Sequence, residues 1–93
     1  MDFIRYDLGY LTTGQTVEVA LSSAANVLLL DTANFNAYST GRQYQYFGGW
    51  VTHTPYRIGI PYPGNWHIAI DLGGAAGSIR SAVSVLGSQG APS

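Results

Sequence analysis

Residues 56–72 of this 93-residue chain read YRIGIPYPGNWHIAIDL and hold two β-prone segments separated by a turn. The first segment, residues 56–60, ends at Pro61, because proline has no amide hydrogen to donate to a sheet. Residues 62–65 (YPGN) are turn formers. Side chains alternate along a strand, so the second segment has two faces. One face carries Trp66, Ile68, Ile70 and Leu72, and the other carries His67, Ala69 and Asp71. The stretch predicts an antiparallel strand–turn–strand unit with a buried tryptophan.

The same rhythm of short β-prone segments and turns runs through the rest of the chain. Residues 15–22 alternate in hydrophobicity, and residues 26–31 (NVLLLD) form an apolar run typical of a strand covered on both faces. Further strands are predicted at residues 3–6, 44–47 and 78–86. Turn signals recur about every ten residues. The sequence therefore predicts an all-β fold: a compact antiparallel sandwich, or a β-prism-like barrel, of about six to seven short strands.

One segment departs from the strand pattern. Asp31 and Thr32 can cap a short helix through residues 33–38, with Gly41 as a left-handed terminator. An irregular loop ordered by asparagine side chains is the alternative. We expect at most one short helical turn, with room for two turns at the limit. The whole forms a single β domain at residues 1–87, and residues 88–93 (SQGAPS) are expected to be a flexible tail.

Charge is sparse in this sequence. The chain has four arginines, no lysine, five acidic residues and a net charge of −1. Nucleic-acid binding and docking on an anionic membrane both need clustered positive charge, so we expect neither partner. The absence of cysteine excludes disulfides, thiol nucleophiles and thiolate metal sites. No apolar run approaches the ~20 residues of a transmembrane helix, and we expect a cytoplasmic location.

The polar motifs predict structural roles. Residues 73–77 (GGAAG) resemble a phosphate-binding loop, but a strand follows them rather than a helix, which favours a tight turn or bulge. Asp31, Asn34 and Asn36 do not have the spacing of a calcium loop. The two histidines have no third ligand with which to complete a zinc site. We therefore expect no metal and no cofactor.

A Ser-His-Asp triad is one candidate for catalysis, but no nucleophile-elbow motif of the G-x-S-x-G type is present to position it. A pair of carboxylates is the other candidate. Asp31 and Asp71 could flank a glycosidic bond, because a pair of carboxylates is the catalytic apparatus of most glycosidases. Both residues end predicted strands, however, where aspartate commonly satisfies turn amides or pairs with an arginine. No nucleophile–base motif accompanies them. We expect a protein that is not an enzyme, with a hydrolase using Asp31 and Asp71 as a remote alternative.

Aromatic residues gather in the loop-rich stretch 38–56. Exposed aromatic rings beside amides, aspartate and arginine form a platform for a sugar ring or a peptide, whereas buried rings would fill the core. Trp66 is expected to anchor the core and Trp50 to lie in an exposed loop, while Tyr44 and Tyr46 would share one face of a strand. The candidate ligand-binding residues are Tyr38, Arg42, Tyr44, Tyr46, Trp50, Asp31 and Asp71.

Several short motifs resemble those of a known family. They are residues 5–9 (RYDLG), 26–31 (NVLLLD), 34–35 (NF), Tyr38, 41–42 (GR), 48–49 (GG), 64–67 (GNWH) and 71–74 (DLGG). Together they are similar to the small bacterial domain-of-unknown-function family eighteen-eighty-three, over residues 3–86. The resemblance implies an all-β domain of β-prism-like build, which occurs alone or attached to other bacterial modules. It brings no activity, cofactor or catalytic residue.

Two further classes of function follow from these observations. The leading hypothesis is a binding or protein-interaction module that recognises a protein partner or its own copies, because the chain combines low charge with high aromatic content. The alternative is a lectin-like carbohydrate-binding domain, in which Asp31, Asp71 or asparagine side chains would bind sugar hydroxyls.

Overall fold

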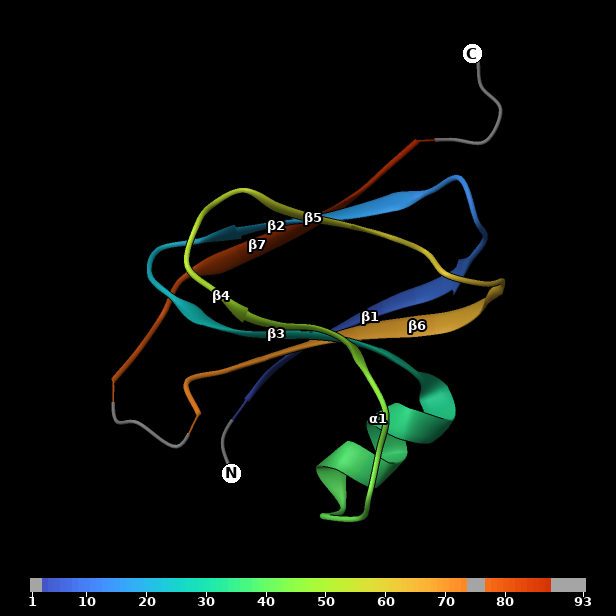
Figure 1. Cartoon of the computed structure of the whole chain (residues 1–93), viewed down its shortest axis with the longest axis horizontal. Helices are drawn as coiled ribbons and strands as arrows, with labels where there is room; N and C mark the ends of the chain where they lie inside the picture. The colour runs from blue at the N-terminus through green and yellow to red at the C-terminus, as the bar shows by residue number, and fades with distance from the viewer. Residues whose placement is uncertain (1–2, 74–76, 88–93) are drawn as a thin grey trace.

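The computed structural model describes residues 3–73 and 77–87, which form two antiparallel sheets and one helix. The larger sheet has the strand order β1-β6-β3-β4 and the smaller one β5-β2-β7. The elements are β1 (Ile4–Leu11), β2 (Thr16–Leu21), β3 (Ala25–Asp31), α1 (Thr32–Ser39), β4 (Phe47–Val51), β5 (Tyr56–Gly59), β6 (Gly64–Asp71) and β7 (Ser81–Leu86). Figure 1 shows the sheets stacked face to face, with α1 on the outer side of the larger sheet. The prediction of an all-β sandwich is confirmed.

The main core lies between the two sheets. Trp66 is fully buried there, as the alternation along residues 66–72 predicted. The larger sheet also contributes Val27, Leu29, Ile68 and Ile70, and the smaller sheet contributes Val17, Val19 and Leu21. Glu18, on the opposite face of β2, forms an ion pair with Arg57 on the outer surface of the smaller sheet. The alternating pattern of β2 therefore reflects one buried and one solvated face.

A second apolar cluster lies on the other face of the larger sheet. Leu28, Leu30 and Ala69 point away from the sandwich core and are covered by Phe35 and Tyr38 of α1. Both faces of β3 are thus buried, which explains why residues 26–31 form a continuous apolar run. The apolar face of α1 is small, because only a few large side chains of the helix pack on the sheet.

The helix confirms the capping signal in the sequence. The Asp31 side chain accepts a hydrogen bond from the amide of Asn34 at 2.9 Å, which is the geometry of an N-cap. The chain leaves the helix through Thr40 and then Gly41, whose φ of +77° is the left-handed conformation expected of a terminator. With eight residues, α1 makes slightly more than two turns and is longer than the single short turn expected.

The prediction of a strand at residues 44–47 is wrong. β4 begins only at Phe47 and continues through Gly48 and Gly49 to Val51, because it pairs with β3 at the edge of the larger sheet. Residues 42–46 instead form an irregular segment, the strap, which lies over α1. Glycine pairs usually end strands, and here they lie within one. Trp50, expected in a loop, is in this strand and is exposed.

Smaller differences concern the ends of other elements. β1 is longer than residues 3–6 and contains a β-bulge between Asp7 and Gly9. β7 begins at Ser81 rather than at residue 78. Residues 74–76 of the predicted glycine turn, and the predicted tail at 88–93, lie outside the described residues. No helix in the part of the chain that the structure describes is long and apolar enough to cross a membrane.

Candidate functional site

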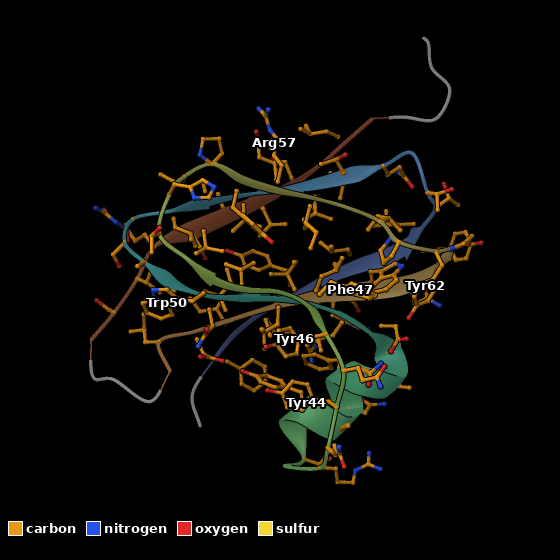
Figure 2. The ribbon with its side chains drawn as sticks, in the orientation of Figure 1. Tyr44, Tyr46, Phe47, Trp50, Arg57 and Tyr62 are labelled. Atoms are coloured by element: carbon orange, nitrogen blue, oxygen red, sulfur yellow. The ribbon has the colours of Figure 1, made fainter. Side chains whose placement is uncertain are left out.

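A groove of about 490 Å³ opens at one end of the sandwich, where β3, α1, β4 and the turn before β6 meet. Its walls are four aromatic rings, those of Tyr44, Tyr46, Phe47 and Tyr62. Its polar groups are Asp31, Asn34 and Gln45, and its floor is Leu29 and Trp66. We call this site the aromatic groove. Figure 2 shows Tyr44 and Tyr46 on the α1 side of the larger sheet, with Phe47 and Tyr62 further along the sheet from Trp50.

Asp31 is the one carboxylate among the described residues that line the aromatic groove. Its Oδ1 accepts hydrogen bonds from the backbone and side-chain nitrogens of Asn34, at 2.9 and 3.0 Å. Its Oδ2 accepts a hydrogen bond of 2.6 Å from the hydroxyl of Tyr62. Burial raises the pKa of Asp31, but the hydrogen bonds from Tyr62 and Asn34 outweigh burial and hold the pKa below its ordinary value of 3.8. The groove therefore carries a negative charge at neutral pH.

The strap positions two of the aromatic walls. The backbone amide of Gln45 donates a hydrogen bond to Oδ1 of Asn34 at 2.9 Å, which attaches the strap to the first turn of α1. The Tyr44 ring packs edge-on against Tyr38, with ring centroids 5.1 Å apart. Tyr46 lies against Tyr44 at 5.8 Å and remains 48% exposed. These contacts hold the rings in place while leaving Tyr46 open to a ligand.

The opposite wall is built on the buried tryptophan. Trp66 donates a hydrogen bond from its indole nitrogen to the carbonyl oxygen of Tyr62 at 3.0 Å, and the two rings lie 4.8 Å apart. Phe47 packs edge-on against both rings and is 43% exposed. A rigid core residue thus supports two half-exposed rings, so the groove is pre-formed.

Comparison with known proteins identifies the family of this chain. A model of the family "Domain of unknown function (DUF1883)" matches residues 1–89. The chain belongs to the DUF1883 family. This confirms the resemblance carried by the turn and core motifs. No curated protein and no solved structure gives a significant match. The family's description contains no activity.

Of the seven residues predicted to bind a ligand, three line the aromatic groove: Asp31, Tyr44 and Tyr46. The sequence interpretation did not include Asn34, Gln45 or Tyr62 in the site. No local pattern could have indicated that Tyr62 meets Asp31, because the contact joins residues 31 positions apart. Phe47 lies within the aromatic stretch 38–56, but its position in the groove depends on where β4 begins.

Tyr38 and Asp71 form a buried pair beneath α1 rather than a ligand platform. The Tyr38 hydroxyl donates a hydrogen bond to Oδ2 of Asp71 at 2.7 Å, and both residues are over nine-tenths buried. Oδ1 of Asp71 accepts from the Asn26 side chain and the Gly73 amide. Burial raises the pKa of Asp71, but these hydrogen bonds outweigh it and hold the pKa below 3.8. The pair links the helix to the sheet.

Asp31 and Asp71 are too far apart to act together on one bond. Asp71 pairs with Asn26, and Asp31 follows Asn26 by five residues on the same strand. At ~3.3 Å per residue, Asp31 lies about 16 Å along β3 from the position opposite Asp71, whereas glycosidases place their two carboxyl groups within about 10 Å of each other. The hydrolase alternative has no support in this geometry.

The remaining two predicted residues lie outside the groove. Arg42 follows α1, is exposed, and donates a hydrogen bond to the hydroxyl of Thr40. Trp50 is 57% exposed and lies at the other end of β4 from Phe47, as Figure 2 shows. No cluster of three or more His, Asp or Glu side chains able to hold a metal ion occurs among residues 3–73 and 77–87.

Proposed function

We propose that this DUF1883 domain is a non-catalytic protein-interaction module that binds a segment of a partner protein in the aromatic groove. The observation that carries the proposal is the groove itself, a pre-formed concavity with half-exposed rings around a charged group. Aromatic residues are enriched at the centres of protein interfaces, because they bury a large area at a low cost in side-chain entropy. Isolated exposed apolar side chains need no such explanation, but Tyr46, Phe47 and Tyr62 are grouped.

The ionised state of the Asp31 carboxylate favours binding over catalysis. A general acid needs a raised pKa so that it carries a proton at neutral pH, and the pKa of Asp31 is lowered. Three hydrogen bonds already fix its orientation. The other groove residues are aromatic, amide or aliphatic side chains, and they include no serine or histidine among the described lining. Such a set recognises a group without transforming it.

The position of the groove favours a chain-like ligand. β4 is an edge strand of the larger sheet, so its outer backbone groups have no strand partner among the described residues. A peptide next to an edge strand can form main-chain hydrogen bonds while its side chains enter neighbouring pockets. The first residue of β4, Phe47, is also a wall of the groove.

Peptide selection tests the proposal. A random peptide library would be selected on the immobilised domain, and the enriched peptides tested on Tyr46→Ala and on Tyr10→Ala. Tyr10 is a matched control because it is 64% exposed and does not line the groove. We expect enriched peptides to bind the wild type and Tyr10→Ala equally and to lose at least tenfold in affinity on Tyr46→Ala. Peptides that bind all three proteins equally, or a library with no enrichment, would contradict the proposal.

Carbohydrate binding is the second candidate, favoured by the exposed ring of Tyr46 next to the amide of Gln45. Sugar rings stack on aromatic faces while amides bind their hydroxyl groups. Titration with an oligosaccharide panel, followed by the amide resonances of the strap, separates the two candidates. A partner that is a second copy of the chain is a form of the leading proposal, and sedimentation of wild type and Tyr46→Ala identifies it.

A further inference from the structure

We propose that the partner group entering the aromatic groove is an arginine side chain, which stacks on the aromatic walls and donates to Asp31. This inference rests on the proposed function and names the chemistry that the groove selects. Three observations lead to it: the sign of the charge on Asp31, the acceptor position that Asp31 has left, and the arrangement of the rings.

The charge in the groove is negative, and the nearest group that acts on it by charge is His67, which lowers the pKa of Asp31 from outside the lining. Among the described residues of the lining, Asp31 is the only carboxylate, and there is no arginine, lysine or histidine. Its donors are neutral: two nitrogens of Asn34 and the hydroxyl of Tyr62. Hydrogen bonds from neutral groups stabilise a carboxylate but do not cancel its charge. A phosphate or carboxylate ligand would be repelled, whereas a cation is attracted.

Asp31 can accept one more hydrogen bond. A carboxylate has about four lone-pair positions, of which Oδ1 uses two and Oδ2 uses one. The position left is on Oδ2, the oxygen that also accepts the hydrogen bond of 2.6 Å from the Tyr62 hydroxyl. A guanidinium group has only donors, and its N–H···O⁻ bond is stronger than one from a neutral hydroxyl.

The rings supply the second half of the site. A cation within about 6 Å of an aromatic centroid is attracted to the negative face of the ring, and a guanidinium can also stack on it. The same pairing occurs elsewhere in this chain, where Cζ of Arg5 lies 5.5 Å from the centroid of Phe35. Figure 2 shows Phe47 and Tyr62 at the same end of the sandwich, with Tyr46 below β4.

The two tryptophans allow a direct test. Trp50 is exposed and lies outside the groove, so Trp50→Phe leaves Trp66, in the groove floor, as the only tryptophan reporter. In this background, N-acetyl-arginine-methylamide and its neutral isostere N-acetyl-citrulline-methylamide would be titrated and followed by Trp66 fluorescence. We expect arginine to bind about fivefold more tightly than citrulline at low ionic strength, and the difference to shrink in high salt.

Two variants locate the site. Asp31→Asn removes the charge but keeps a good N-cap for α1, and it should reduce arginine binding to the level of citrulline. Tyr46→Leu should weaken arginine binding several-fold, while Tyr10→Leu, the matched exposed control, should not. A thermal melt of each variant shows that it is folded.

The possible outcomes separate this inference from the proposed function. Equal binding of arginine and citrulline, or unchanged arginine binding by a folded Asp31→Asn, would overturn the arginine site. Selected peptides that occupy the groove without an arginine would also overturn it, while the protein-interaction proposal would stand. If no peptide depends on Tyr46 but arginine still binds in an Asp31-dependent manner, the arginine site stands and the interaction proposal fails.

Discussion

Asp31 and Asp71 show how two residues of one type take different roles in the same fold. Asp31 ends β3, caps α1 and faces the aromatic groove. Asp71 ends β6 and accepts hydrogen bonds from Tyr38, Asn26 and the amide of Gly73. The sequence correctly indicated that both would satisfy nearby amides, because both stand where a strand ends. Their tyrosine partners come from other parts of the chain and carry no local signal.

The Tyr38–Asp71 pair predicts a pH dependence of stability at both extremes. Because the folded-state pKa of Asp71 is lowered, its contribution is complete above the ordinary value of 3.8 and is lost as the pH falls through the lowered folded value. The pKa of Tyr38 is raised by burial and by the hydrogen bond to Asp71, so its contribution is complete below 10.0 and is lost as the pH rises beyond it. Denaturant unfolding at stepped pH measures both limbs.

Tyr38→Phe is the variant that tests this pair. Loss of the hydroxyl leaves Oδ2 of the buried Asp71 without its donor, which should cost about 1–3 kcal/mol at neutral pH. The pKa of Asp71 should rise, and the alkaline loss of stability attributed to Tyr38 should disappear. An unchanged Asp71 titration, followed by NMR, would show that the hydrogen bond does not hold the carboxylate in its charged form.

At the scale of the element, β4 is the strand that the sequence misplaced. This strand, Phe47–Val51, contains two consecutive glycines with φ of +111° and +144°. The strand predicted from the sequence covered residues 44–47 and ended before these glycines. Pairing with β3 decided otherwise, because Val51 and Phe47 lie opposite Ala25 and Leu29 of a strand that is buried on both faces. This shift by a few residues is what brings Phe47 into the groove.

The two glycines of β4 should respond differently to substitution. A Cβ on Gly48 would overlap the carbonyl oxygen of Val27, whereas a Cβ on Gly49 would meet nothing within 4 Å. Gly49→Ala therefore carries only backbone strain, about 1–3 kcal/mol, and Gly48→Ala should cost more because β4 must also move away from β3. Chemical denaturation of the two variants measures the difference. Equal costs would show that β4 can move away from β3 freely.

At the scale of the whole molecule, the two tryptophans have different roles: one stabilises the core and the other lies on the surface. Trp66 is fully buried between the sheets, so Trp66→Ala should cost ~3–5 kcal/mol, a large part of the ~5–15 kcal/mol of a typical domain. Trp50→Ala, with an exposed side chain, should change the free energy of unfolding by less than about 0.5 kcal/mol. Denaturant titration followed by circular dichroism gives both values. A Trp66→Ala protein with near-native stability would contradict the assignment of the core anchor.

The sequence by itself determined the elements that depend on neighbouring residues. Alternation placed Trp66, Ile68 and Ile70 on one face, an unbroken apolar run identified β3, and Asp31 with Gly41 delimited the helix. The motifs also indicated the DUF1883 family. These features are local because the side-chain period and the capping geometry are set within a few residues.

Only the tertiary structure decided which side chains share the aromatic groove. Asp31, Gln45 and Tyr62 come from three segments, and they meet because β3 lies between β6 and β4 in the larger sheet. The same packing buried Tyr38 and Asp71 and separated Trp50 from the rings near Phe47. Contacts between distant segments depend on strand order and register, and neither is specified by the pattern within any one segment.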